Sequence, residues 1–170
     1  KLVNAASASN PALLTVNLDD PSGYGRVLRN NQGQVVAIVE QKDGNAAQLL
    51  VKEINTGIMA IPGAPLKRWL SQLGNSNAQG EYYLTDVIAM AVADGYPVIG
   101  VATDDPDEVA GVNDKSQLAQ TERALQRRLA SALMQQGVTL RDPARLDCRG
   151  QLVAGSDVVV DVNVVFEEIG

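Results

Sequence analysis

An apolar residue recurs every six positions near the C-terminal end of this 170-residue chain. The positions are Leu140, Leu146, Leu152, Val158 and Val164. A helix repeats its apolar face every 3.6 residues and a simple strand every two, so neither produces this spacing. Sixfold spacing is typical of the hexapeptide repeats of a parallel β-helix. Because stacked coils supply the core of that fold, we expect residues 138–170 to form its first coils and further coils to follow.

A long helix is predicted directly before the repeats. Asp114 and Gln117 form a capping box at the start of residues 115–136, and Gly137 ends the helix. Four leucines give it a narrow apolar stripe, at positions 118, 125, 129 and 133. A helix of about 20 residues spans about 30 Å, which favours a strut between two modules. We therefore expect a helical arm at residues 115–137.

The first part of the chain alternates predicted strands with helices, which indicates an α/β layered domain over residues 1–114. Strands are predicted at 12–18, 25–28, 35–40, 53–61 and 97–101, and helices from Pro65 and near Thr85 or Asp86, either of which can cap the second helix. The run 35–39 is apolar at every position, which suggests burial on both faces. Trp69 is expected in the core, and residues 25–40 are expected to form a hairpin.

Two polar residues are candidates for ligand binding because of where they fall on these strands. Glu40 ends a buried strand, where open α/β sheets place ligands. Asn55 shares one face of its predicted strand with Gly57, which leaves cleared space beside the amide. The alternatives are a glutamate that has left the core for solvent and an asparagine that bonds to neighbouring backbone.

Residues 77–86 combine Gly80, Tyr82, Tyr83 and two acids just before a predicted helix. The segment reads either as the lead-in loop of a capped helix or as a loop that faces a substrate, since binding groups concentrate in loops on rigid elements.

Composition excludes several classes of chemistry. The chain has no histidine, so Ser-His-Asp catalysis, Cys-His catalysis and His-ligated zinc are impossible within it. Cys148 stands alone, which excludes a disulfide framework and suits a reducing cytoplasm. A net charge of −6 argues against a nucleic-acid or anionic-membrane surface, and no apolar run is long enough to span a bilayer. A soluble protein follows.

The chain resembles one known family, the bifunctional N-acetylglucosamine-1-phosphate uridyltransferase/glucosamine-1-phosphate N-acetyltransferases. The matching residues occur in the family's order and cover nearly the whole chain: LDDPSGYGR at 18–26, IVEQKD at 38–43, EINTGI at 53–58, NAQGEYYLTD at 77–86, GVN at 111–113 and LRDPAR at 140–145. Each motif alone is weak, but the ordered set followed by hexapeptide repeats is specific.

The resemblance implies a fold and a set of binding residues. Residues 1–114 would be the C-terminal part of a Rossmann-like nucleotidyltransferase domain, and residues 138–170 the start of a left-handed β-helix that trimerises and binds acetyl-CoA. Substrate contacts would come from Gly25, Glu40, Asn55, Tyr83, Thr85 and Asn113. Asn113 would also offer an amide oxygen to Mg²⁺, which accepts such hard ligands.

The implied reaction needs no protein nucleophile. The phosphate oxygen of N-acetylglucosamine-1-phosphate attacks the α-phosphorus of UTP, pyrophosphate leaves, and UDP-N-acetylglucosamine forms for peptidoglycan and lipopolysaccharide precursors. Positioning and metal stabilisation of charge would drive this step. The sugar phosphate itself would come from acetylation of glucosamine-1-phosphate by acetyl-CoA.

The resemblance also implies that parts of both active sites are missing. The family's phosphate loop, uracil-binding residues and metal-binding aspartate would precede residue 1, and its acetyltransferase residues would follow residue 170. We therefore expect a central fragment with no catalytic residue of its own, inactive in isolation, of a protein that is a cytoplasmic homotrimer when complete. Two alternatives stay open: another sugar-1-phosphate nucleotidyltransferase with a β-helix tail, and a non-catalytic trimerising assembly module.

Overall fold

The structure, a computed structural model, describes residues 2–7, 10–112 and 114–167. It divides into two compact units, residues 1–109 and 110–170. The finer boundaries expected from the sequence, 1–114, 115–137 and 138–170, stay predictions.

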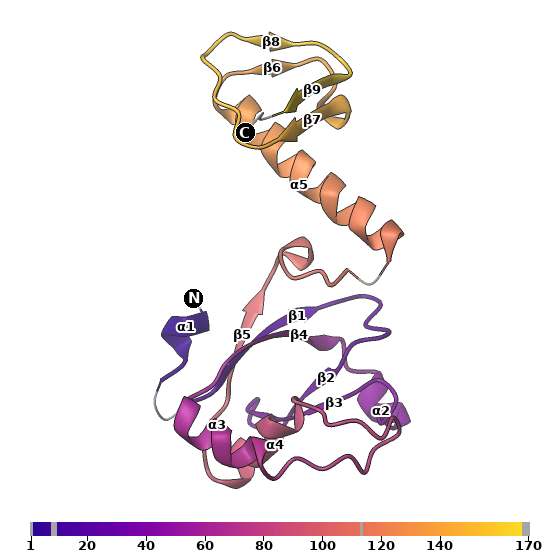
Figure 1. Cartoon of the computed structure of the whole chain (residues 1–170), viewed down its shortest axis with the longest axis vertical. Helices are drawn as coiled ribbons and strands as arrows, with labels where there is room; N and C mark the ends of the chain where they lie inside the picture. Colours follow the sequence, from indigo (N-terminus) through magenta and orange to yellow (C-terminus); the bar gives the residue numbers. More distant parts are fainter. Residues whose placement is uncertain (1, 8–9, 113, 168–170) are drawn as a thin grey trace. The chain divides into compact units, whose positions relative to one another are not determined.

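The first unit is built on a mixed five-stranded sheet (Figure 1). Its strands are β1 (Ala12–Asn17), β2 (Arg26–Arg29), β3 (Val35–Val39), β4 (Glu53–Ala60) and β5 (Ile99–Thr103), in the order β3-β2-β4-β1-β5. β1 and β5 are parallel, while β1–β4, β4–β2 and β2–β3 are antiparallel. The predicted α/β class and the predicted hairpin of β2 with β3 are thereby confirmed.

Helices and short turns precede, connect or follow the strands. They are α1 (Leu2–Ala5), α2 (Ala46–Leu49), α3 (Gly63–Leu70), α4 (Asp86–Ala93) and the 3₁₀ turn η1 (Pro106–Glu108). Helix α3 begins two residues before Pro65, the predicted first residue. The N–H groups of a helix's first turn have no intrahelical partner, so a proline at the third position costs no hydrogen bond.

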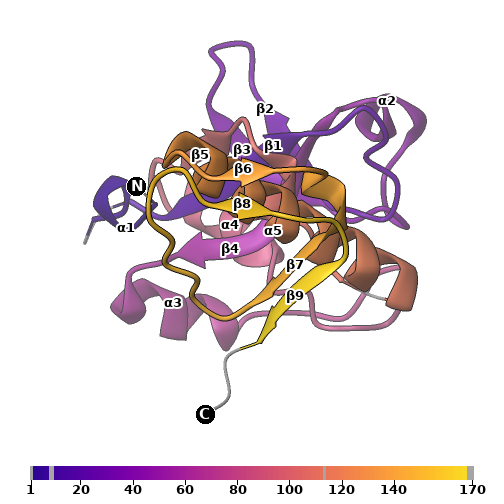
Figure 2. The same ribbon diagram turned by 90° about the horizontal axis from the view of Figure 1, so that it is seen from above.

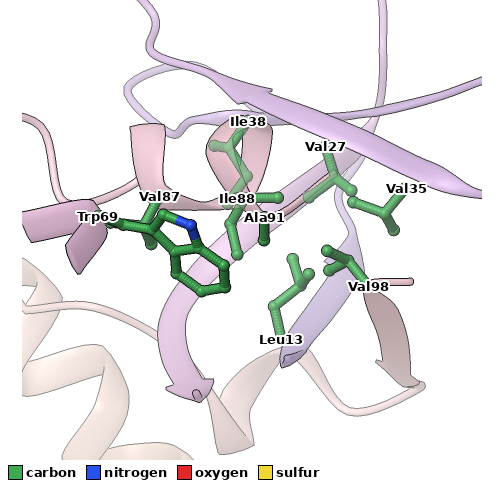
Figure 3. Packing of buried hydrophobic residues seen from close by; sticks show 9 residues of the cluster. All are labelled: Leu13, Val27, Val35, Ile38, Trp69, Val87, Ile88, Ala91 and Val98. Carbon is green, nitrogen blue, oxygen red and sulfur yellow. The ribbon is translucent and has the colours of Figure 1, made fainter. Parts of the chain in front are cut away.

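The main core lies between one face of the sheet and helices α3 and α4 (Figure 3). Trp69 of α3 is fully buried there, as predicted, and meets Tyr96 edge-on with the ring centres 5.3 Å apart. Its indole Nε1 donates a 2.7 Å hydrogen bond to Asp94. Strand residues such as Leu13 and Ile38 point at the same centre as Ile88 of α4. Burying this face fixes the strand ends that carry the candidate site.

Strand β3 is not buried on both faces, contrary to the prediction. Only Val35 and Ile38 of this strand are buried, because β3 is an edge strand of the described sheet. The pairing shifts between Leu28/Ala37 and Arg29/Val35, so Val36 is an extra residue on this strand. Such a bulge explains how Val35 and Ile38, three positions apart, both enter the core.

The second unit combines one long helix with two pairs of short parallel strands (Figure 2). Its elements are α5 (Lys115–Gln135), β6 (Thr139–Leu140), η2 (Pro143–Arg145), β7 (Leu146–Arg149), β8 (Val159–Val160) and β9 (Val164–Glu167). β6 pairs with β8, and β7 pairs with β9. The Asp114 side chain accepts a hydrogen bond from Gln117 N at the start of α5, which is the capping half of the predicted box.

The six-residue spacing holds for one strand pair and slips in the other. Leu146 is paired with Val164, three repeats later. Leu140, however, is paired with Val160 rather than with Val158. Val160 is accordingly buried at 7% exposure while Val158 is 39% exposed. Asp157 has a positive φ of 60°, a turn conformation that accompanies the slip.

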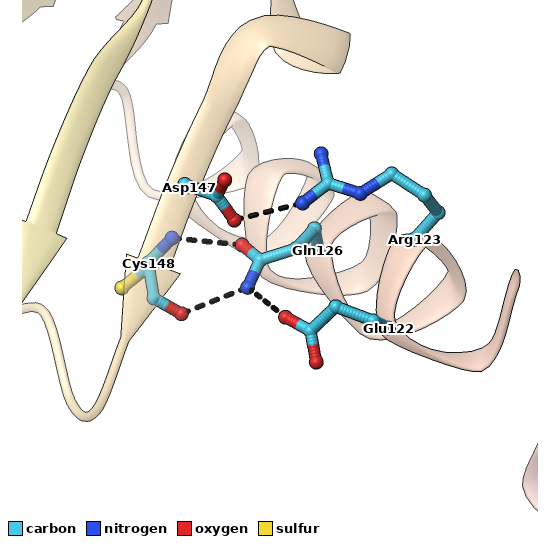
Figure 4. A network of polar contacts seen from close by, with 5 residues as sticks. All are labelled: Glu122, Arg123, Gln126, Asp147 and Cys148. Carbon is cyan, nitrogen blue, oxygen red and sulfur yellow. Dashed lines mark hydrogen bonds and ion pairs between the residues drawn. The ribbon is translucent and has the colours of Figure 1, made fainter. Parts of the chain in front are cut away.

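The predicted leucine stripe of α5 is only partly buried. Leu133 packs with Ala130 against Val138, Leu146 and Val160, whereas Leu118 and Leu125 are 57% and 49% exposed. The residue that the pattern missed is Gln126, which is 3% exposed. Its amide oxygen accepts from Cys148 N at 2.8 Å, and its Nε2 donates to Cys148 O at 2.9 Å (Figure 4). Gln126 therefore pairs with the backbone of β7 as a neighbouring strand would.

Candidate functional site

Three predicted site residues meet at the ends of adjacent strands. Asn55 N of β4 donates a 2.9 Å hydrogen bond to the carbonyl of Gly25, which precedes β2. Gly25 in turn lies against Glu40, the residue after β3: a Cβ added at Gly25 would be 3.3 Å from each carboxylate oxygen and 2.9 Å from Ile38 Cγ2. The absence of a side chain at Gly25 therefore makes room for the carboxylate.

Thr85 joins this group through its side chain. Its hydroxyl donates a 2.8 Å hydrogen bond to Glu40 Oε1, and the residue is 8% exposed. The sequence predicted that Thr85 or Asp86 caps α4, but Thr85 at the cap position makes no side-chain capping bond. Its hydroxyl points to Glu40 instead, so the helix start serves to hold the carboxylate.

Tyr83 is linked through Asp43 to the same strand ends, next to Glu40. Its hydroxyl donates to Asp43 Oδ2 at 3.0 Å and accepts from Gln79 Nε2 at 2.9 Å. Ala78 N donates to the other oxygen of Asp43 at 2.8 Å, and Lys42 Nζ to Gln79 Oε1 at 2.6 Å. Partial desolvation, with help from the Asp43 bond and charge, raises the pKa of the Tyr83 phenol, which Gln79 opposes. The loop 77–85 is thus tied to residues 40–43.

A pocket of about 400 Å³ opens beside Glu40 and the loop 77–85. Glu40 and Tyr83 line it together with Asp43 and Asp86. Burial, and next the negative charge of Asp43, raise the pKa of the Asp86 carboxyl. The pocket is therefore an acidic one, suited to hydroxyl and amide donors. A second cavity of about 460 Å³ lies beside the β2–β3 hairpin and contains none of the predicted site residues.

The surroundings of Asn55 differ from the prediction. Thr15 pairs with Asn55 but Leu13 pairs with Met59, so β4 has two more residues than β1 over this stretch. Simple alternation therefore fails after Asn55, and Gly57 adopts a φ of +81° that glycine tolerates best. Gly57 N donates to the Asn55 side-chain oxygen at 3.2 Å. Gly57 is thus needed for a bulge, and the amide of Asn55 helps to hold that bulge.

Sequence reasoning missed two acidic residues that line the pocket, namely Asp43 and Asp86. In the sequence Asp43 appears only within the motif at 38–43, and Asp86 as a possible helix cap. Their roles depend on the spatial approach of residues 40–43 to residues 77–86, which no local pattern contains. The substrate-binding roles of Gly25, Glu40, Asn55, Tyr83 and Thr85 stay predictions.

Asn113 is the residue predicted to bind Mg²⁺. Asn113 lies outside the described residues, so its predicted phosphate and Mg²⁺ contacts are not located. Across residues 2–7, 10–112 and 114–167, no group of three or more Asp, Glu, Cys or His side chains is arranged to hold a metal ion. These residues alone do not fit a resident Mg²⁺ site.

No described helix is both long and apolar enough to cross a membrane.

Comparison with known proteins assigns the chain. It is 57% identical over 167 residues, 98% of its length, to the Bifunctional protein GlmU of Methylococcus capsulatus. The proteins of the same name from Pseudomonas putida and a Marinomonas species are 58% and 54% identical over the same share of this chain. The chain belongs to the GlmU family. It spans 36–37% of the length of these GlmU relatives, and no protein-family model matches it.

Proposed function

We propose that this GlmU chain supplies the acceptor-sugar side of a uridyltransferase site that makes UDP-N-acetylglucosamine from UTP and N-acetylglucosamine-1-phosphate. The observation that carries the proposal is the group formed by Gly25, Glu40 and Thr85, with Asn55 bonded to the Gly25 backbone. A carboxylate held by a threonine hydroxyl beside a glycine presents acceptor oxygens to sugar hydroxyls at close range. The pocket next to it is large enough for such a sugar.

The role of these residues is to bind and orient the sugar. Glu40 accepts hydroxyl hydrogen bonds, and Gly25 allows the sugar to approach the backbone. Holding the acceptor fixes the direction from which its phosphate oxygen attacks, which lowers the entropic cost of the step. Mg²⁺ would supply stabilisation of phosphate charge when bound, although the described residues do not form its site. Acetyl-CoA would serve the second activity, the acetylation that produces the sugar phosphate.

The proposal extends to the architecture and setting of the complete protein. Residues 1–114 would form the C-terminal part of a nucleotidyltransferase domain. Residues 115–137 would form a helical arm, and residues 138–170 would form the start of a left-handed β-helix. The pairing of Leu146 with Val164, three hexads apart, supports one coil per eighteen residues. We further propose a homotrimer that works in the cytoplasm on peptidoglycan and lipopolysaccharide precursors.

Removal of either polar side chain at the site is expected to weaken sugar-nucleotide binding. Hydrogen bonds to charged groups contribute about 1.5–3 kcal/mol, so Glu40→Ala should lower affinity for UDP-N-acetylglucosamine by roughly tenfold to a hundredfold. Asn55→Ala should lower it by roughly tenfold, because a neutral hydrogen bond is weaker. Calorimetric titration with and without Mg²⁺ measures both effects. Glu122→Ala, in the second unit, is the control and should bind as the unaltered chain does.

Two results would contradict this assignment. One is an unaltered chain that melts cooperatively but binds no UDP-N-acetylglucosamine. The other is binding that neither substitution weakens.

Gly25→Ala tests the close approach of the glycine to Glu40. The added Cβ would lie 2.9 Å from Ile38 Cγ2 and 3.3 Å from the Glu40 carboxylate, so the carboxylate must move. We expect a loss of affinity of at least about tenfold, equal to about 1.4 kcal/mol, in the same titration. Gly63→Ala is the matched control, because a Cβ there meets no atom within 4 Å. Equal binding by both variants would show that the contact is irrelevant to the ligand.

A further inference from the structure

Asp43 lines the pocket, but both oxygens of its carboxylate are bonded to the loop 77–85. Its Oδ1 accepts a 2.8 Å hydrogen bond from Ala78 N, and its Oδ2 accepts one of 3.0 Å from the Tyr83 hydroxyl. Glu40 differs, because only its Oε1 accepts a hydrogen bond, from Thr85, among the described residues. Glu40 thus keeps one oxygen for a ligand, whereas Asp43 holds the loop.

The turn inside this loop is organised by the side chain of Asn77. Its Oδ1 accepts hydrogen bonds from Gln79 N at 3.1 Å and from Glu81 N at 3.2 Å, and its Nδ2 donates to the carbonyl of Glu81. Gly80 completes the turn with a φ of +68°. The shape of the turn is therefore set within the loop, and its position is set by the groups to which it is bonded.

Polar contacts rather than apolar burial attach the loop to the end of β3. No residue of 77–84 is buried, and Tyr82 is 68% exposed. Lys42 Nζ donates to Gln79 Oε1, but both residues lie at the surface, where a long side chain gains little from one contact. Asp43 accepts two hydrogen bonds with a charged group, which are stronger than bonds between neutral groups. Asp43 is therefore the main attachment.

Tyr83 transmits this attachment to the pocket. Its ring lines the pocket, and its hydroxyl is held between Asp43 and Gln79. A hydrogen bond at the far end of the ring limits the rotation of the whole side chain. A ligand that meets a fixed wall does not have to order that wall as it binds, so part of the entropic cost of binding is avoided.

We propose that Asp43 is a positioning residue for sugar binding: it holds the loop 77–85 and the Tyr83 ring in the arrangement that the ligand meets, and it does not itself contact the ligand. The inference rests on the proposed function and adds a residue to it. It also separates the tasks of two neighbouring carboxylates, since Glu40 binds and Asp43 positions.

Asp43→Ala should lower affinity for UDP-N-acetylglucosamine by about tenfold in calorimetric titration, because the ligand must then order the loop. Asp43→Asn keeps an acceptor oxygen for Ala78 N, so its loss should be only about threefold. The melting temperature of both variants should stay close to that of the unaltered chain. Asp19→Ala is the matched control, because it removes an exposed carboxylate paired with Lys52, and it should leave affinity unchanged.

Two further measurements separate positioning from direct contact. Tyr83→Phe keeps the ring but removes the hydroxyl that donates to Asp43, so Asp43→Ala should lower affinity by only about threefold in that background. Amide hydrogen exchange without ligand reports the attachment itself. Exchange at Ala78 should become faster in Asp43→Ala, while exchange at Leu13, in the core, should not change.

Three results would overturn the positioning role. The first is an unchanged affinity in Asp43→Ala. The second is an equal loss with and without the Tyr83 hydroxyl, which would mean that Asp43 acts on the ligand directly. The third is faster exchange at Leu13 as well as at Ala78, which would mean that the whole unit is destabilised. An unaltered chain that binds no UDP-N-acetylglucosamine contradicts the proposed function, and this inference with it.

Discussion

Trp69→Ala is expected to destabilise the first unit by about 3–5 kcal/mol, the range for deleting a large buried aromatic side chain. The ring is fully buried between α3 and the sheet, and its neighbours in the core include Val87 and Ile88 (Figure 3). The substitution removes three contributions together: the buried area, the edge-on contact with Tyr96 and the hydrogen bond to Asp94. Urea unfolding followed by circular dichroism measures the loss, since the single tryptophan is no longer present to report it.

Trp69→Phe separates packing from hydrogen bonding. It keeps an aromatic ring but removes the Nε1–H that donates to Asp94. We expect a smaller loss of unfolding free energy than for Trp69→Ala, because Asp94 still pairs with Arg68 and is exposed to water. The Trp69 bond is the first cause, ahead of Arg68, of the lowered pKa of Asp94. That pKa should therefore rise toward its ordinary value in Trp69→Phe. For Trp69→Ala, a decrease of less than about 1 kcal/mol in the free energy of unfolding would contradict the described core.

The sequence predicts the framework of the sheet well because its signals are local. The strands predicted at 12–18, 25–28, 35–40, 53–61 and 97–101 lie within two residues of their observed bounds. Failures occur where tertiary contacts override a local pattern. Val35 and Ile38 enter the core through a bulge, and Thr85 uses its hydroxyl on Glu40 rather than on the helix start.

The candidate site is predictable only in part for the same reason. Glu40 stands out because it ends a strand that the sequence predicts as buried, where open α/β sheets place ligands, and Asn55 because asparagine is depleted in strands. Only the family resemblance assigns substrate contacts to Gly25, Tyr83 and Thr85, although the local pattern at residues 77–86 already includes a substrate-facing loop as one of two readings. Asp43 is not predicted as a site residue, because its partner Tyr83 lies 40 positions away in the sequence.

Gln126→Ala should produce the largest change in the second unit. It would leave the backbone N–H and C=O of Cys148 without their partner, and both groups are buried with this residue (Figure 4). An unsatisfied buried polar group costs about 1–3 kcal/mol, so we expect a loss of roughly 2–4 kcal/mol for the pair. Amide hydrogen exchange at Cys148, alongside urea unfolding, measures the effect at the strand where it arises.

Gln120→Ala is the matched control, because it makes the same substitution at an exposed position of α5. It should change stability by less than about 0.5 kcal/mol, as surface substitutions usually do. The neighbouring Arg123–Asp147 ion pair, at 2.7 Å and partly exposed, is expected to contribute little and cannot replace the amide. If Gln126→Ala leaves exchange at Cys148 as slow as in the unaltered chain, the helix does not close the edge of β7. Fast exchange confined to Gln126→Ala would show that one helical side chain serves as the neighbouring strand for β7.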